Sequence, residues 1–235
     1  QLHRRQRQMC IRDRGKPIDK EEWGMTPQTV NAYYSPLLNE IVFPAGILQP
    51  PFFNMEADDA VNYGAIGAVI GHEMGHGFDD KGSKYDGNGE LRNWWTESDR
   101  KQFEERTKKL IDQYNGYTVV DGTPVNGEFT QGENIGDLAG IVIAYKAYQL
   151  SKKGSQAPII DGLTGDQRFF FGWATIWGSK STDEQLIRQI KTDPHSPGEF
   201  RANGPLVSMP EFVNLYNVKP GDGMYIDPND RVKIW

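Results

Sequence analysis

Residues 69–80 of this chain read Val-Ile-Gly-His-Glu-Met-Gly-His-Gly-Phe-Asp-Asp. Apolar and glycine residues dominate the run before the first histidine, which favours a helix. His72 and His76 are four residues apart, so on a helix both imidazoles project from one face and can bind one metal ion. Glu73 lies beside them and can take a proton from water at that metal. This motif is typical of zinc peptidases.

The same five-residue pattern can arise by chance, and a histidine pair on a helix can be an ordinary surface feature. Here the pair extends an apolar stripe with i, i+3, i+4 spacing, formed by Val61, Ala65, Ala68, Val69, His72 and His76. Glycines form a second stripe that lets another element approach the helix backbone, namely Gly64, Gly67, Gly71 and Gly75. Burial of two histidines favours a ligand role over a surface role.

The third ligand decides which kind of zinc site this is. The H-E-x-x-H-x-x-G-x-x-H pattern needs a glycine and a histidine where this chain has Asp79 and Gly82, so that pattern is excluded. A carboxylate is expected instead, and Glu133 is the best candidate because it begins a second apolar helical segment. Asp137 follows on the same face and can accept the outer N–H of a ligand histidine. The alternative is that Glu133 only stabilises a helix N-terminus.

Five segments in one order resemble the C-terminal catalytic part of the neprilysin family of zinc endopeptidases. That family includes endothelin-converting enzyme and bacterial oligopeptidase O. The matching segments are residues 31–34 (Asn-Ala-Tyr-Tyr), 41–53 (Ile-Val-Phe-Pro-Ala-Gly-Ile-Leu-Gln-Pro-Pro-Phe-Phe), 72–80, 133–140 and 192–201. The resemblance implies a mainly helical α+β, thermolysin-like (gluzincin) zinc peptidase catalytic domain over residues 15–235, truncated at its N-terminus. An upstream helical lobe of the family is missing.

The resemblance also implies the metal chemistry. His72, His76 and Glu133 would bind one Zn²⁺ per chain, and Glu73 would act as general base and then pass the proton to the leaving amine. The implied substrates are oligopeptides, cleaved on the amino side of hydrophobic residues.

Residues around the metal receive supporting roles from the same resemblance. Asp137 and Asp79 would orient the two histidine ligands. His195 would donate to the oxyanion of the tetrahedral intermediate, with Asp193 holding its ring. Without the resemblance, residues 193–197 are a rigid proline-flanked turn in which a histidine is usually exposed.

Substrate binding is implied for a further set of residues. Arg201 would bind a substrate carbonyl, while Asn31 and the main chain of Ala32 would hold the peptide as an added strand. A hydrophobic pocket for the residue after the cut bond would be lined by Ile47, Phe52, Val69, Ile176 and Trp177. The alternative for these large apolar residues is an ordinary core position.

Composition agrees with one enzyme domain. The 235 residues are 37% hydrophobic and 25% charged, with a net charge of −6. An acidic chain gives no reason to expect nucleic-acid binding. No apolar run reaches the length of a membrane span, and no secretory signal pattern opens the chain. We expect a monomer, and the family resemblance favours a location outside the cytoplasm.

Residues 1–14 do not match the rest of the chain, because they hold five arginines and one acidic residue. We expect a non-native tail here; the alternative is a basic arm for nucleic acid. The only cysteine, Cys10, lies in this tail. The body therefore has no disulfides, which favours a bacterial-type homologue over the disulfide-rich extracellular animal members.

Helix start signals precede four segments, at Thr96, Thr164, Thr182 and Ser208. Strands are expected to be few and short, at residues 29–34, 41–43 and 117–120.

Two functions other than peptide hydrolysis are compatible with parts of the sequence. Residues 86–97 superficially resemble a calcium-binding loop, but Leu91 occupies the position that requires glycine, so this motif fails. The other alternative is a catalytically inactive zinc-binding or peptide-binding homologue, against which the presence of Glu73 and His195 argues.

Overall fold

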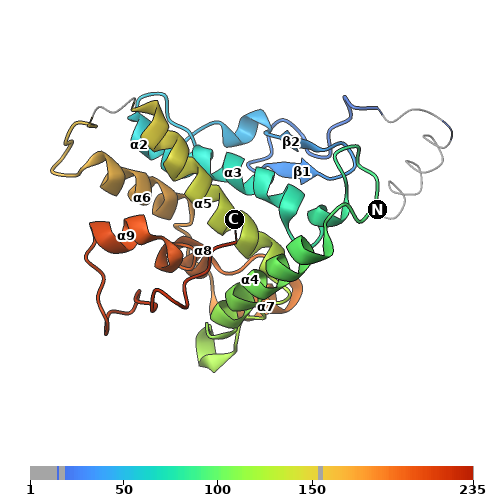
Figure 1. Cartoon of the computed structure of the whole chain (residues 1–235). Helices are drawn as coiled ribbons and strands as arrows, with labels where there is room; N and C mark the ends of the chain where they lie inside the picture. The colour runs from blue at the N-terminus through green and yellow to red at the C-terminus, as the bar shows by residue number, and fades with distance from the viewer. Residues whose placement is uncertain (1–14, 16–18, 153–155, 235) are drawn as a thin grey trace.

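The computed structural model describes residues 15, 19–152 and 156–234. This part of the chain is mainly helical, with one two-stranded antiparallel hairpin (Figure 1). The hairpin strands are β1 (Tyr33–Ser35) and β2 (Glu40–Val42). The α-helices are α2 (Asp59–Asn62), α3 (Ala68–Gly75), α4 (Glu97–Asn115), α5 (Gln131–Ser151), α6 (Gly165–Ile176), α7 (Asp183–Thr192), α8 (Gly198–Asn203) and α9 (Pro210–Leu215). The predicted α+β, mainly helical class is confirmed.

Helices α3 and α5 cross in close contact near the centre of the fold (Figure 1). A Cβ atom added at Gly71 would lie 2.8 Å from the backbone of Gly140, and one added at Gly136 would lie 2.8 Å from the His72 ring. Only glycine permits such an approach. The expectation for the glycine stripe is thus confirmed at Gly64, which faces the backbone of α6, and at Gly71 and Gly75, which face α5. Gly67 faces only its own helical segment.

The apolar stripe differs from the prediction upstream of α3, because Tyr63–Gly67 form a π-helical turn. A π turn shifts the angular register of the residues before it. Ala60 is therefore buried where the uninterrupted α-helical pattern placed Val61, which is half-buried. Ala68 and His72 are buried as predicted.

Helices α4, α6 and α7 begin where their start signals lie. Helix α9 differs, because Met209 is its N-cap and the Ser208 hydroxyl instead accepts a hydrogen bond from the main-chain N–H of Val232. The hydroxyl of each N-cap threonine accepts a hydrogen bond from a main-chain N–H in the first turn, at Asp99, Gln167 and Gln185 respectively. These hydrogen bonds satisfy main-chain donors that have no partner within the helix.

The expected strands are only partly present. The first strand begins at Tyr33 rather than at residue 29. No strand forms at residues 117–120, where Thr118 makes a single bridge with Pro124 and Val120–Gly122 form a 3₁₀ turn. Residue pairing over a few positions depends on a neighbouring strand, which the local sequence does not reveal.

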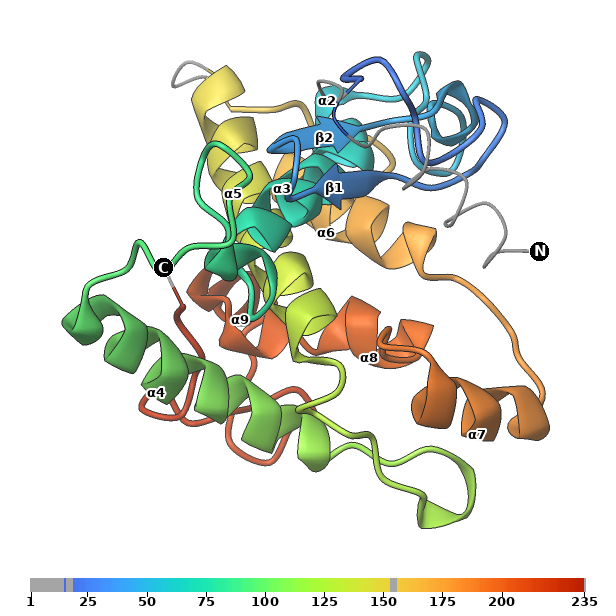
Figure 2. The same cartoon turned by 90° about the vertical axis from the view of Figure 1, so that its right-hand side faces the viewer.

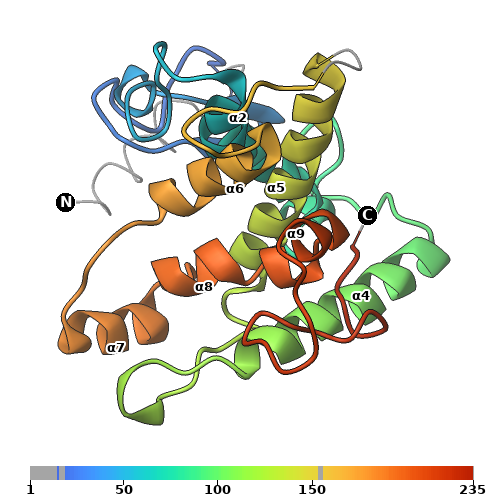
Figure 3. The same cartoon turned by 90° about the vertical axis from the view of Figure 1, so that its left-hand side faces the viewer.

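Helix α5 contributes to two hydrophobic clusters. Figures 2 and 3 show α4, α6 and α9 arranged around it. On one face it packs against α6 and α9 through residues that include Tyr148, Phe169 and Trp173. On the other it packs against α4 and the C-terminal segment through residues that include Leu110, Tyr114, Ile135 and Val232. A third cluster joins the hairpin region to the π turn and α3 through Ala32, Ile47 and Ile66. Packing on both sides fixes α5, and with it the first turn that carries Glu133.

Candidate metal centre and active site

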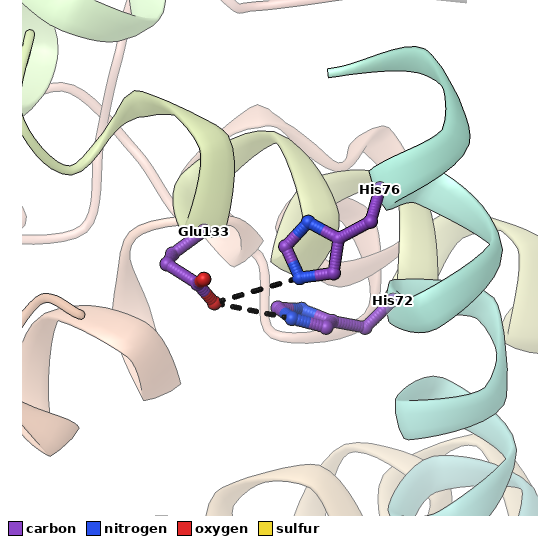
Figure 4. Close-up of side chains that lie close together, drawn as sticks. All are labelled: His72, His76 and Glu133. Carbon is purple, nitrogen blue, oxygen red and sulfur yellow. Dashed lines mark ion pairs between the residues drawn. The ribbon is translucent and has the colours of Figure 1, made fainter. Parts of the chain in front are cut away.

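Side chains from α3 and α5 converge at the crossing of these helices (Figure 4). His72 belongs to α3, His76 opens the 3₁₀ turn that follows, and Glu133 lies in the first turn of α5. Glu133 Oε2 is 3.2 Å from His72 Nε2 and 3.8 Å from His76 Nε2. Ligand atoms of a tetrahedral zinc site with bonds of about 2.0–2.2 Å are separated by about 3.4 Å. The three side chains therefore fit a single zinc ion.

The outer nitrogen of each histidine is bound by a carboxylate. His72 Nδ1 is 2.8 Å from Asp137 Oδ1, and His76 Nδ1 is 2.8 Å from Asp79 Oδ2. When the Nδ1–H of each ring donates to its carboxylate, the Nε2 atom of that ring keeps the lone pair that a metal ion requires. Asp137 and Asp79 thus each contact the outer nitrogen of one candidate ligand histidine.

The carboxylates around the candidate metal centre stabilise positive charge there. Burial lowers the pKa of His72, but hydrogen bonds to Asp137 and Glu133 outweigh this effect and raise the pKa to about 9. Burial raises the pKa of Glu133, but His195 and His72 lower it far below its usual value. Glu133 Oε2 is buried, and Nε2 of His72 and Nε2 of His195 each lie 3.2 Å from it. A buried carboxylate is costly unless a cation, either a protonated histidine or a metal ion, lies beside it.

Glu73 lies next to His72 in α3, is 5% exposed and lines the cavity at the metal centre. Burial raises the pKa of its carboxyl group, and the nearby histidines offset part of that increase. A carboxylate with a raised pKa is well suited to accept a proton near neutral pH. His76 is half-buried, so the expected burial of both histidines is correct only for His72.

His195 reaches the same centre from the segment between α7 and α8. Its Nε2 is 3.2 Å from Glu133 Oε2, and its Nδ1 is 2.6 Å from Asp193 Oδ1. A hydrogen bond to Glu133 is the largest cause that raises the pKa of His195. The fold therefore brings this histidine to the metal centre, although an isolated turn would leave it exposed.

Arg201 forms a contact that sequence analysis did not foresee. Its Nε and Nη2 donate to the two carboxylate oxygens of Asp137, each over 2.7 Å. Burial lowers the pKa of Arg201, but Asp137 raises it above its ordinary value. The guanidinium also lies 4.0 Å from the centroid of the Trp177 ring. Asp137 therefore links Arg201 to His72, a pairing that a separation of 64 residues gives no means of predicting.

A cavity of about 470 Å³ lies over the metal centre. The predicted substrate residues that line it are Asn31, Ala32, Ile47, Phe52, Val69, Trp177 and Arg201. Ile176 does not line it and instead borders a neighbouring cavity of about 490 Å³ that also contacts Trp177.

Helical geometry explains the position of Ile176. Successive helical residues point about 100° apart, so Ile176 and Trp177 project in different directions. Trp177 borders both cavities, whereas Ile176 borders only the neighbouring one. Trp173 precedes Trp177 by four residues and does line the cavity at the metal centre. It was missed by sequence analysis, although the i, i+4 spacing from Trp177 was a usable signal.

The helix-borne histidine pair, its adjacent glutamate and a carboxylate ligand on a second helix define the class of zinc metallopeptidases. A family model described as "Peptidase family M13" matches residues 31–232, and this chain belongs to that family.

Individual relatives agree with the family model. The chain is 44% identical to Neprilysin-3 of Drosophila melanogaster and 45% identical to Endothelin-converting enzyme 1 of Homo sapiens, in each case over 94% of the chain. It covers 28% and 29% of their lengths.

Solved structures share the fold. The zinc metalloprotease Zmp1 of Mycobacterium tuberculosis, solved with an inhibitor, superimposes with a TM-score of 0.94 at 56% identity, covering 98% of this chain and 36% of Zmp1. PepO of Lactobacillus rhamnosis superimposes with a TM-score of 0.84 at 39% identity, covering 94% of this chain and 34% of PepO. The chain thus spans about a third of the length of these proteins. None of its described helices is both long and apolar enough to cross a membrane.

Proposed function

We propose that this chain carries the catalytic part of a zinc-dependent endopeptidase that hydrolyses oligopeptides. One observation carries the proposal: ligand atoms of His72, His76 and Glu133 lie within 4.8 Å of one another, in the cavity that Glu73 also lines. A metal-binding set beside a buried carboxylate is what metal-assisted hydrolysis needs.

In this proposal, His72, His76 and Glu133 hold one zinc ion. Bound zinc lowers the pKa of a water molecule and polarises the carbonyl group of the bond to be cut. Glu73 accepts the proton of the attacking water and delivers it to the leaving amine. Asp137 and Asp79 keep the histidine rings oriented through their Nδ1–H groups.

Two cationic groups act on the substrate. His195 Nε2 donates a hydrogen bond to the oxyanion that forms when the carbonyl is attacked, while Asp193 holds the opposite ring nitrogen. Arg201 uses Nε and Nη2 to bind Asp137, which leaves Nη1 to donate to a substrate carbonyl. Asn31 and Ala32 precede β1 at the cavity wall, where an extended peptide can pair with the main chain.

Specificity comes from the apolar part of the cavity. We assign the pocket for the residue after the cut bond to Ile47, Phe52, Val69 and Trp177, with Trp173 in place of Ile176. Large hydrophobic side chains gain the most from such a wall, so cleavage is expected on their amino side.

The activity of the whole protein is also a proposal, because the chain covers less than a third of its curated relatives. The resemblance to the neprilysin family supports an upstream lobe that limits access to oligopeptides, a monomeric state and a location outside the cytoplasm. A whole protein that rapidly digests folded proteins would contradict the size limit.

The test is to incubate the complete chain with a mixed peptide library, with and without a zinc chelator, and to map the cuts by mass spectrometry. We expect cuts on the amino side of large hydrophobic residues that disappear with chelator and return with added zinc. Cleavage that persists with chelator would contradict the proposal. Zinc binding without any cleavage would favour a catalytically inactive homologue.

A further inference from the structure

A buried chain of hydrogen bonds holds the segment that carries His195. Ser196 follows His195 directly and is 1% exposed, and its hydroxyl donates to Asn134 Oδ1 over 2.9 Å. Asn134 is fully buried and follows Glu133 in α5. One hydrogen bond therefore joins the residue after His195 to the residue after a candidate metal ligand.

The direction of each hydrogen bond in this chain is fixed. Thr130 Oγ1 donates to the main-chain carbonyl of Asn126 over 3.0 Å, since a carbonyl can only accept. Asn134 Nδ2 then donates to Thr130 Oγ1 over 2.9 Å, which leaves Asn134 Oδ1 to accept from Ser196. A single orientation of the Asn134 amide satisfies all these bonds.

The same segment is also held from the side of α7. Gln189 Nε2 donates to the carbonyl oxygens of His195 and Ser196, over 3.2 and 3.4 Å. Asp193 Oδ1 accepts from the main-chain N–H of His195 over 2.9 Å and binds its ring Nδ1. These contacts leave the ring Nε2 directed towards Glu133.

We propose that Ser196 and Asn134 are positioning residues that hold His195 at a fixed distance from the metal centre. The inference rests on the proposed function, in which His195 donates to the oxyanion. Its physical basis is that a donor acts on a developing charge only when its supporting residues keep it in place, and a displacement of about 1 Å can cost roughly a hundredfold in rate. The rival account is that the Ser196 hydrogen bond only stabilises the fold.

A double-mutant cycle separates the two accounts. Ser196→Ala is made in the complete chain and in the His195→Gln chain, and peptide hydrolysis is measured for all four proteins. We expect Ser196→Ala to lower kcat by roughly tenfold to a hundredfold with KM within about twofold, and to have no further effect once His195 is replaced. An equal loss of kcat in both backgrounds, or no loss in either, would overturn the proposal.

Ser208→Ala is the matched control. Ser208 is also buried, and its hydroxyl accepts from the main-chain N–H of Val232 over 2.9 Å, away from the cavity at the metal centre. We expect this variant to lower the melting temperature and leave kcat unchanged. A loss of kcat in Ser208→Ala equal to that in Ser196→Ala would assign the effect to general destabilisation.

Hydrogen exchange tests the inference without peptide hydrolysis. In Ser196→Ala, the amides of Asp193, His195 and Ser196 should exchange at least several-fold faster than in the unchanged chain, and in Ser208→Ala they should not. If the unchanged chain cleaves no peptide, the proposed function fails, but hydrogen exchange still decides whether Ser196 positions His195. Unchanged exchange in Ser196→Ala would refute the positioning role of Ser196.

Discussion

The three candidate metal ligands come from two helical segments that touch along glycines, whereas the cavity wall above them comes from segments spread between Asn31 and Trp177. We call His72, His76 and Glu133 the metal floor. The wall comprises Asn31, Ala32, Ile47, Phe52, Val69, Trp173 and Trp177. Each histidine of the floor has a carboxylate on its outer nitrogen, while the wall is held by apolar packing.

This difference predicts how each part responds to substitution. Floor side chains act as one unit, because removing any ligand or its hydrogen-bonded partner changes metal affinity. Wall side chains act nearly independently, because each contributes its own contact with a substrate side chain. Floor variants should therefore change catalysis as a whole, whereas wall variants should change which peptides are cut.

The largest effect is expected from loss of a floor ligand. Glu133→Ala removes one of three metal ligands and should abolish zinc binding and chelator-sensitive hydrolysis together. Metal analysis after gel filtration and a peptide assay check this. Glu128→Ala is a control at an exposed position five residues earlier. A Glu133→Ala chain that kept zinc at full occupancy would place the third ligand elsewhere.

Replacement of His195 should act on catalysis alone. Because its Nε2 acts on the oxyanion, His195→Gln should lower kcat by about 10²–10³-fold while zinc content stays at one per chain. Steady-state kinetics on one peptide and metal analysis decide this. A rise in KM with kcat unchanged would show that His195 only binds substrate.

Replacing a carboxylate that binds the outer nitrogen of a floor histidine should reduce zinc affinity by less than loss of a ligand does. Asp79→Asn weakens the partner of His76 and should raise the zinc dissociation constant by about 10–100-fold. Competition with a zinc-binding dye measures this. Asp80→Asn is the control, since Asp80 Oδ1 is buried without a hydrogen bond. Equal effects of the two substitutions would mean that charge near the site, rather than the hydrogen bond to His76, controls affinity.

The smallest effect is expected at the wall. Val69→Ala enlarges the cavity and should change the ratio of kcat/KM for leucine and phenylalanine after the cut bond by roughly tenfold. Ile176→Ala should leave this ratio within about twofold, because Ile176 borders the neighbouring cavity. Competing peptides that differ at this one position provide the measurement. A larger change from Ile176→Ala than from Val69→Ala would return Ile176 to the pocket.

The difference between the floor and the wall also explains which parts of the site could be predicted from sequence. The positions of His72 and His76 follow from four-residue spacing on one helix, and the glycine stripe predicted the close approach of another element at Gly71. The π turn at residues 63–67 could not be predicted, because the apolar periodicity fits an uninterrupted α-helix. The Arg201–Asp137 pair was missed because it joins distant helices.

Wall positions were predicted only through the family resemblance. The apolar type of a residue such as Ile176 does not say whether it faces a cavity or the core. Helical spacing favours Trp173 over Ile176, because residues four apart, such as Trp173 and Trp177, share a face of the helix.

In the proposed mechanism, Glu73 transfers the proton at a zinc site that it does not help to hold. Glu73→Gln tests this role directly, when zinc content and peptide hydrolysis are measured on the same sample. We expect one zinc per chain and a loss of kcat of about 10²–10⁴-fold. Hydrolysis at the rate of the unchanged chain would show that Glu73 is not the base.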